Sequence, residues 1–575
     1  MISQVSEKFS SLFSNPKNPI RIAISFGGTV ILTSAIVTTA IVAVRQLGVL
    51  EGFELRSYDY FIRSLPPEEP DNRVLVVGIT EEDIQKLKEA SISDATMAKF
   101  LNKIEEYEPR AIGIDVLRDV PIGPGRQDLI KILKNNENII AGCKLSSESE
   151  PGAAAAPEVP KERIGFADLP QDPDIIMRRT TLVSTPTTPN GAVENIHVCN
   201  YADPENQVLS LAFNVALLYL DKDNIFPQPI EEGANEGDIK LGRTLFKRLR
   251  DNVGGYRNLD APDYQILIKY RSGEKAIPQV SLVDVLNGKI NPALVKDRIV
   301  MLGYTATTKN DDFATPYSAG DRDRVEMPGV LIHANIVSQI ISAVWDNRPL
   351  IWYWHFGGEV LWIFGWSLAG GTLAWSIRLP WLFILASGAA IAILYGISYF
   401  LFLQSGWIPL IPAGLGVVVT AGIVVLIDRY SKTVTQTVKK LFRMDVEIDT
   451  DKVAAEVSAI TETETFQILK KRAAERKGLI NNTNDRDISH PAPETFAETP
   501  ITQDAKTTTT DVMEDGNQKA RELIILQNDD NNQSNSENLE ETTTTEELGG
   551  EATDDYLQQL QKRGIRMRNK DDNEL

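Results

Sequence analysis

The residues best suited to chemistry in this sequence are a few carboxylates between residues 48 and 350. Asp115 ends a strand-like apolar run, and Asp119, Asp311 and Asp312 are further candidates for an acidic cluster. Sites on parallel α/β sheets collect at the carboxyl ends of the strands, and carboxylate oxygens are ligands that Mg²⁺ and Ca²⁺ prefer. These residues therefore allow a metal-dependent hydrolase that uses Asp115 and Asp312.

Sequence motifs of common enzyme classes are missing from the same stretch. It contains no D-x-D-x-D-G loop, no H-E-x-x-H, no G-x-S-x-G and no Walker A motif. Carboxylates that cap helices or pair with arginines such as Arg118 and Arg178 explain the acidic residues more simply. We favour this interpretation and predict no catalytic residue, no bound metal and no cofactor.

Two further ionisable residues lie in apolar surroundings. His333 falls in an apolar helical stretch, where a hydrogen-bonded structural histidine is more common than a catalyst. Glu359 lies about two turns into an apolar run and on the same helical face as His355. An ionisable group at membrane depth is a candidate coupling or proton site. We favour the alternative that Glu359 lies near the lipid headgroups and stays wet.

Four apolar runs are long enough to cross a bilayer, at about 1.5 Å per residue against roughly 30 Å of hydrocarbon. They cover residues 22–44, 354–377, 380–403 and 408–427. A cleaved signal peptide is the alternative for the first run, but the run exceeds the usual apolar region of about 7–15 residues. We predict an uncleaved anchor followed, after a large domain, by a three-helix transmembrane bundle.

The positive charges place both termini on the cytoplasmic side. They precede the first run, occupy the turn between the second and third, and follow the fourth, at Lys8, Lys17, Arg21, Arg378, Arg429, Lys432, Lys439, Lys440 and Arg443. Residues 1–21 are then a cytoplasmic N-terminus and residues 48–350 are extracytoplasmic. We predict a multi-pass protein of a bacterial plasma membrane, and the lack of a glycosylation sequon in residues 48–350 is compatible with a bacterial origin.

The large domain shows the pattern of an α/β fold with a parallel sheet, because strand-like and helical runs alternate. The expected strands are 73–79, 111–116, 139–145, 266–270 and 298–303, and the expected helices are 94–107, 281–286 and 329–342. Cys143 and Cys199 have no metal-binding spacing. They could form a disulfide if the domain is extracytoplasmic, but we favour two separate buried thiols.

Several motifs of the domain, taken in order, resemble the second type of CHASE domain, a sensory extracellular domain of bacterial receptors. They are Tyr58-Asp59 with Arg63, Ala111 to Asp115, Gly165-Phe166, Val300 to Gly303, Asp311-Asp312, Thr315-Pro316 and Pro328 to Ala334. The resemblance implies a ligand-sensing domain followed by three transmembrane helices. Within it we take Asp115, Asp311, Asp312 and His333 as candidate ligand-binding residues.

The C-terminal part has no recognisable enzymatic output domain, because it contains no H-R-D or D-F-G set and no Gly-rich nucleotide loop. Residues 428–480 carry fragments of a heptad repeat and predict a juxtamembrane helical segment, and one interpretation is a homodimer through it. Residues 481–575 contain nine Lys/Arg against twenty-two Asp/Glu and two aromatics, which predicts an acidic disordered tail. With a net charge of −20, the chain lacks the basic face of a nucleic-acid binder.

These observations favour a sensor that receives an extracytoplasmic ligand and relays the signal to a separate cytoplasmic effector through its tail. One alternative is a membrane scaffold or assembly protein that senses nothing. The other is the metal-dependent hydrolase considered above.

Overall fold

The computed structural model describes residues 27–442, apart from residues 157, 191–194, 231, 234, 258, 260, 262, 273–275 and 319–325, together with residues 468, 471 and 472. The predicted acidic tail, residues 481–575, lies outside the described residues.

The large domain is built on a six-stranded sheet whose neighbouring strands all pair in parallel. In spatial order the strands are β11 (Gln279–Ser281), β1 (Val74–Ile79), β12 (Ile299–Tyr304), β2 (Ala111–Asp115), β3 (Ile139–Cys143) and β4 (Ile164–Phe166). The predicted strands at 73–79, 111–116, 139–145 and 298–303 are confirmed to within two residues. Every residue of β1 is buried, as expected when helices cover both faces of a parallel sheet.

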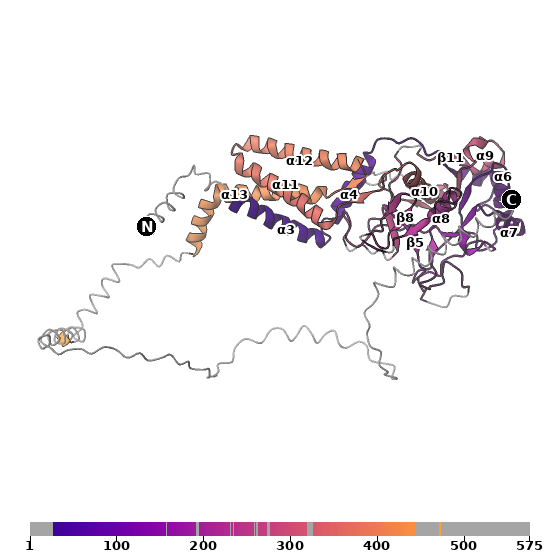
Figure 1. The fold of residues 1–575 in the computed structure, drawn as a ribbon, viewed down its shortest axis with the longest axis horizontal. Helices are drawn as coiled ribbons and strands as arrows, with labels where there is room; N and C mark the ends of the chain where they lie inside the picture. Colours follow the sequence, from indigo (N-terminus) through magenta and orange to yellow (C-terminus); the bar gives the residue numbers. More distant parts are fainter. Residues whose placement is uncertain are drawn as a thin grey trace. The chain divides into compact units, whose positions relative to one another are not determined.

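Helices cover the two faces of this sheet in separate layers (Figure 1). The helices α8 (Leu211–Asp221) and α10 (Gly329–Trp345) pack on one face, with Val74 and Val76 of β1. The helices α5 (Glu81–Leu87), α6 (Asp94–Glu105), α7 (Arg126–Asn135) and α9 (Leu282–Leu286) lie on the other, with Leu75, Val77 and Ile79. Alternate residues of one strand thus feed two different cores, as the two-residue period of a strand requires.

Smaller antiparallel sheets extend the domain. The strands β5 (Arg179–Ser184), β6 (Val208–Leu209) and β10 (Tyr264–Leu267) form one sheet, and β7 (Pro227–Pro229), β8 (Ile239–Leu241) and β9 (Thr244–Phe246) form another. A two-stranded pair joins β13 (Asp312–Phe313) to β14 (Met327–Pro328). The strand expected at 266–270 therefore begins earlier and belongs to an antiparallel sheet.

The helices that flank the domain run side by side (Figure 1). A π-helical turn (Gly27–Ile31) leads into α3 (Leu32–Gln46), which is followed by α4 (Glu51–Arg63). After the domain come α11 (Phe356–Ser376), α12 (Pro380–Leu403) and α13 (Leu410–Phe442). Glycine allows close contact here, since a Cβ on Gly370 of α11 would lie 2.3 Å from the Val417 carbonyl oxygen of α13.

Three helices of the described chain are long and apolar enough to cross a membrane: Gly28–Gln46, Pro380–Leu403 and Leu410–Ile427. They match the first, third and fourth predicted runs. The helix α11 covers the second predicted run but is not among the three, because Glu359 and several glycines lower its hydropathy. Its passage through the membrane stays a prediction. The predicted juxtamembrane helix is observed as far as Phe442.

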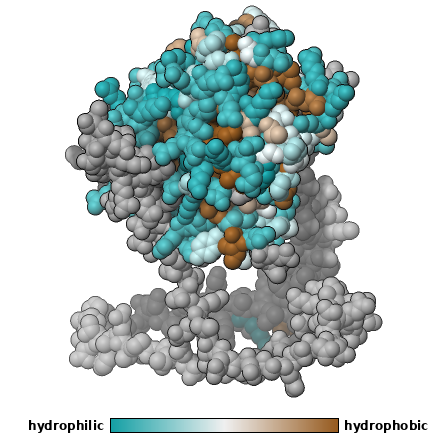
Figure 2. Space-filling model, turned by 90° about the vertical axis from the view of Figure 1, so that its right-hand side faces the viewer, coloured by the Kyte–Doolittle hydropathy of each residue, from teal (hydrophilic) through white to brown (hydrophobic). Residues whose placement is uncertain are grey.

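The end of the domain seen in Figure 2 is mainly hydrophilic, with hydrophobic residues in small separate patches. Such a surface is typical of a domain in contact with water. It contrasts with the helices α3 and α12, where large aliphatic side chains such as Ile36 and Ile384 are more than half exposed.

Candidate functional site

The carboxyl edge of the parallel sheet brings three of the four predicted ligand-binding residues together. Asp115 is the last residue of β2 and pairs with Gly303 of β12, so its side chain lies where the strands end. His333 comes from the second turn of α10, and its Nε2 lies 3.9 Å from Oδ1 of Asp115. The Asp311 carboxylate lies over the first residue of α10, since a Cβ on Gly329 would be 3.1 Å from it.

Asp312 does not share this arrangement. It lies in the short strand β13, opposite Pro328 of β14, where successive side chains point to opposite faces. The residue that sequence analysis overlooked is Asp168, just beyond β4, whose charge acts on the His333 imidazole. Asp168 lies two residues after the end of β4, a strand that was not expected from the sequence, so no strand-ending signal marked this aspartate.

Burial controls the protonation of this cluster. Desolvation raises the pKa of Asp115 to about 7, and desolvation followed by the Asp115 charge raises the pKa of Asp311 to about 7. Desolvation lowers the pKa of His333 to about 4, so the imidazole is neutral near pH 7. Its Nε2 is 3.2 Å from the Ala167 carbonyl oxygen and donates to it, because a carbonyl can only accept.

The cluster is not arranged as a metal centre. Within the described residues, no group of three or more histidine, cysteine or acidic side chains could hold a metal ion. The Nδ1 atom of His333 is buried and has no hydrogen-bond partner there. The charges of Asp115 and Asp311 interact, so deprotonation of one carboxyl group disfavours deprotonation of the other.

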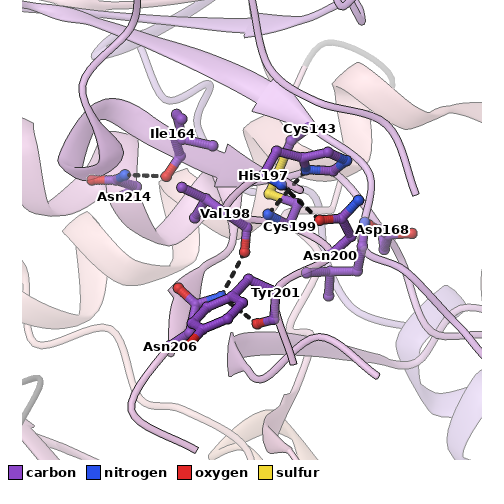
Figure 3. The surroundings of a disulfide bond; sticks show 11 residues. Cys143, Ile164, Asp168, His197, Val198, Cys199, Asn200, Tyr201, Asn206 and Asn214 are labelled. Carbon is purple, nitrogen blue, oxygen red and sulfur yellow. Dashed lines mark hydrogen bonds between the residues drawn. A yellow bond between two sulfur atoms is a disulfide. The ribbon is translucent and has the colours of Figure 1, made fainter. Parts of the chain in front are cut away.

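Cys143 and Cys199 form a disulfide beside this edge (Figure 3). The bond joins the end of β3 to a loop 56 residues later. Local hydrogen bonds shape that loop: Asn206 Nδ2 donates to the carbonyl oxygens of Val198 and Tyr201, each at 2.7 Å. The favoured expectation of two separate thiols was wrong, because residue spacing does not reveal that this loop folds back onto β3.

A second group of ionisable residues lies where the domain meets the apolar helices. Arg45, near the end of α3, is 3% exposed and contacts two buried glutamates. Its Nε donates to Glu54 of α4 at 2.9 Å, and its Nη1 donates to Glu359 of α11 at 2.5 Å. Its Nη2 donates to the Gly254 carbonyl oxygen of the domain at 2.6 Å. We call Arg45, Glu54, Glu359 and the Gly254 carbonyl the Arg45 node.

The Arg45 node corrects the interpretation of Glu359. The Glu359 side chain is 5% exposed and is paired, so it is not in contact with bulk water. His355 does not act with it but caps α11, where its Nδ1 accepts from the Gly358 amide. Arg257 of the domain lies 3.7 Å from the Glu359 carboxylate. Two arginines and two glutamates therefore balance one another out of water, as buried charges require.

Close backbone packing brings the domain to this node. Gly254 adopts a positive φ of 53°, and a Cβ there would lie 2.4 Å from the Trp407 ring. A Cβ on Gly255 would lie 2.7 Å from the same ring and 2.9 Å from Glu54 Cβ. Only glycine fits between Trp407 and α4 at these two positions.

The helix α4 carries a second buried ion cluster on its domain side. Arg178, which has no exposed surface, binds the Asp59 carboxylate of α4 through two bonds of 2.7 Å each. The same guanidinium contacts Asp172 and Asp174, and Tyr256 donates to Asp172 at 2.7 Å. The sequence places Asp59 in one of the ordered motifs and names Arg178 only as a general partner for carboxylates. It marks Arg45 only by its place at the end of an apolar run.

Comparison with models of protein families gives a match to a sensory domain. The family model of the CHASE2 domain matches residues 36–372, which is more than half of the 575 residues. Searches of curated proteins and of solved structures each found no match.

Removal of the disulfide tests its place in the fold. We expect the Cys143→Ser, Cys199→Ser double variant to lose about 2–5 kcal/mol of unfolding free energy, because the unfolded chain is no longer cross-linked. Urea unfolding of the full chain in detergent micelles measures this loss. Dithiothreitol should lower the wild-type midpoint to the value of the double variant and leave the variant unchanged. An unchanged wild-type midpoint would contradict the pairing.

Replacement of Asp115 tests the protonation of the cluster. An unfolded aspartate titrates near about 3.9, whereas the pKa of Asp115 in the folded chain is about 7. The protonated carboxyl favours folding below pH 4, and this contribution is lost as the pH rises through 7. Asp115→Asn should therefore gain stability relative to wild type between pH 5 and pH 8, by roughly 1–3 kcal/mol.

The unfolding free energies of wild type and of Asp115→Asn, measured at pH 5 and at pH 8, give this gain. The matched control is Asp128→Asn, an exposed carboxylate on α7 outside the cluster, which should show the same difference from wild type at both pH values. Equal behaviour of Asp115→Asn and Asp128→Asn would argue against a buried, protonated Asp115.

Proposed function

The chain belongs to the CHASE2 family of extracellular sensory domains, and we propose that it is a membrane-anchored sensor that relays an extracytoplasmic signal to a separate cytoplasmic effector. The resemblance inferred from the ordered motifs is confirmed over residues 36–372. Membership of the family accounts for the domain and its location in a membrane protein. The relay, the signal and the effector are the proposal.

The observation that carries the proposal is the Arg45 node. One guanidinium joins α3, α4 and α11 to the Gly254 turn of the sensory domain. The node thus connects the domain to the helices on both of its ends in the sequence. A movement of the Gly254 turn must either carry Glu359 and α11 with it or break two contacts. These contacts are the hydrogen bond from Arg45 to the Gly254 carbonyl oxygen and the buried ion pair between Arg257 and Glu359.

The energetics favour movement of the Gly254 turn together with the rest of the Arg45 node. Leaving one charge of a buried pair without its partner costs about 3–5 kcal/mol, whereas a ligand shifts a two-state equilibrium by its difference in affinity for the two states. Differences of about 1–3 kcal/mol are typical of coupling between sites. A ligand of ordinary selectivity therefore moves the intact node and does not pull it apart.

The proposed topology has both termini in the cytoplasm and four passes, with α11 as the second. The buried pairing of Glu359 supports a pass by α11, because its charge is neutralised by Arg45. The effector binds the tail beyond α13, and a homodimer through residues 428–480 is part of the same proposal.

The alternatives receive less support. No contact in the described chain distinguishes a scaffold from a sensor, and the family is sensory. The hydrolase interpretation finds no metal-holding group among the described residues. We therefore propose a protein without enzymatic activity of its own.

A ligand screen tests the sensor directly. The full chain in lipid nanodiscs is screened by thermal shift against small molecules, ions and a range of pH. A sensed ligand should raise the melting temperature without being consumed, and it should change hydrogen exchange in α13 beyond Ile427. Consumption of the ligand would point to an enzyme, and a constant set of crosslinked partners without any ligand response would point to a scaffold.

Two variants sharpen this screen. Glu359→Gln should keep the thermal shift caused by the ligand but lose the exchange response in α13, because the link to α11 is weakened. Glu82→Gln, which removes an exposed carboxylate paired with Lys86, should keep both. A full exchange response in Glu359→Gln would exclude relay through the Arg45 node.

The balance of buried positive and negative charges at the Arg45 node predicts how variants there change stability. Arg45→Met leaves Glu54 and Glu359 with Arg257 alone and should lower the unfolding free energy by about 3–5 kcal/mol. Adding Glu54→Gln restores the balance between Arg257 and Glu359 and should recover part of the loss. Urea unfolding measures both variants. Lys86→Met, at an exposed pair, should change stability by less than about 1 kcal/mol, and a failure of Glu54→Gln to recover any stability would contradict the charge balance.

A further inference from the structure

A cleft of about 340 Å³ lies where the sensory domain leads into α11. Its walls come from β9 and the residues after it, from β10, from the end of α10, and from the connector at residues 347–353. The lining is largely apolar and includes Leu245, Ile266, Leu350, Ile351, Trp352 and Tyr353. A volume near the low end of about 300–1,000 Å³ for ligand sites suits a headgroup or a short apolar segment.

The cleft borders the helices that enter the membrane. Trp352 and Tyr353 form β15 and pair with Gly406 and Trp407, which form β16 between α12 and α13. The indole Nε1 of Trp352 donates to the Gln404 carbonyl oxygen, just after the end of α12, at 2.8 Å. Tryptophan and tyrosine are favoured at the level of lipid headgroups, so the apolar wall of the cleft lies at that level.

Positive charge surrounds the cleft. Lys247 lines it and is exposed, and it begins the sequence Lys-Arg-Leu-Arg at residues 247–250. Arg348 also lines it, although Glu68 holds this guanidinium through two bonds of 2.8 Å each. Buried Asp238 accepts from the Arg248 amide at 3.0 Å, and its charge interacts with Arg250, Lys247 and Arg248 together. Lys247 makes no ion pair with any described residue and is the cation left for a ligand.

The side-chain amide of Gln339, a polar group that lines the cleft, is not available to bind a soluble anion. Gln339 accepts from the Lys269 amide at 2.8 Å and donates to the Leu267 carbonyl oxygen at 3.0 Å. Its amide is therefore used within the domain, and a small anion in the cleft would meet mainly apolar side chains. A ligand with an anionic headgroup at Lys247 and an apolar body against Trp352 would match both the cationic and the apolar parts of the lining.

We propose that this cleft binds the headgroup and glycerol region of an anionic phospholipid from the adjacent leaflet. The phosphate lies at Lys247, and the acyl chains return to the bilayer along Trp352 and Tyr353. A lipid in this position contacts both the end of α10 and the connector to α11. The proposal adds a ligand class to the sensor proposed above, but lipid binding itself does not depend on signalling.

Native mass spectrometry of the full chain in detergent micelles tests the site. Phosphatidylglycerol and phosphatidylcholine with identical chains are titrated separately, and glycerol 3-phosphate is titrated as a free headgroup. We expect about tenfold tighter binding of phosphatidylglycerol than of phosphatidylcholine, because each cation near the surface favours an anionic lipid. We expect no saturable binding of glycerol 3-phosphate. Equal affinity for the two lipids, or tight binding of glycerol 3-phosphate, would overturn the proposal.

Two charge reversals locate the site. Lys247→Glu should weaken phosphatidylglycerol binding at least about fivefold and leave phosphatidylcholine binding unchanged. The matched control is Lys131→Glu, an exposed lysine on α7 that does not line the cleft, which should bind like wild type. Equal losses in the two variants would assign the effect to general surface charge and overturn the proposal.

A third variant depends on volume and not on charge. Leu350→Trp should reduce binding of both lipids by filling the cleft, and unchanged binding would place the lipid elsewhere. Melting temperatures within a few degrees of wild type show that each variant is folded. Saturable, Lys247-dependent lipid binding without any ligand response in α13 would uphold the lipid site and reject the sensor. A ligand response in α13 without a preference for anionic lipid would uphold the sensor and reject the lipid site.

Discussion

The burial of Arg45 is the constraint on which the rest of the molecule depends. A guanidinium cannot be taken out of water without partners, and Arg45 is 3% exposed at the end of an apolar helix. Its partners come from α4, from α11 and from the Gly254 turn of the domain. The chain can bury this one charge only if α4, nine residues away, and two segments more than 200 residues away arrive at the same place.

The helix α4 links the Arg45 node to the sensory domain, because buried ion pairs hold it at both sides. Glu54 faces Arg45, and Asp59 faces Arg178 on the domain side. Five residues separate the two carboxylates, so they lie on different faces of the helix. A movement of α4 would disturb both clusters together. The parallel sheet presents a third set of buried ionisable groups, Asp115, Asp311 and His333, which lack strong partners and respond to burial by changing protonation.

Parts of this arrangement follow from local sequence pattern. The strands β1, β2, β3 and β12 are short apolar runs bounded by polar residues, and their bounds agree with that pattern. The strand-ending position of Asp115 correctly predicts its place at the carboxyl edge, and the apolar stretch around His333 correctly predicts a helix. Asp312 is grouped with Asp311 in the sequence only because the two are adjacent; Asp312 pairs with Pro328 in β13, whereas the Asp311 carboxylate lies over Gly329. The wet interpretation of Glu359 was wrong, because depth in an apolar run says nothing about the cation that meets it.

Membership of the CHASE2 family, the α/β class of the domain and the positions of the apolar helices could all be inferred from the amino-acid sequence. These properties depend on residue types within windows of a few turns, where periodicity and motif order are visible. Which charges meet depends instead on the tertiary fold. Arg45 and Glu359 are 314 residues apart, Asp59 and Arg178 are 119 apart, and the bridged cysteines are 56 apart. No local pattern encodes such pairs, because each contact exists only once the intervening chain has packed and excluded water.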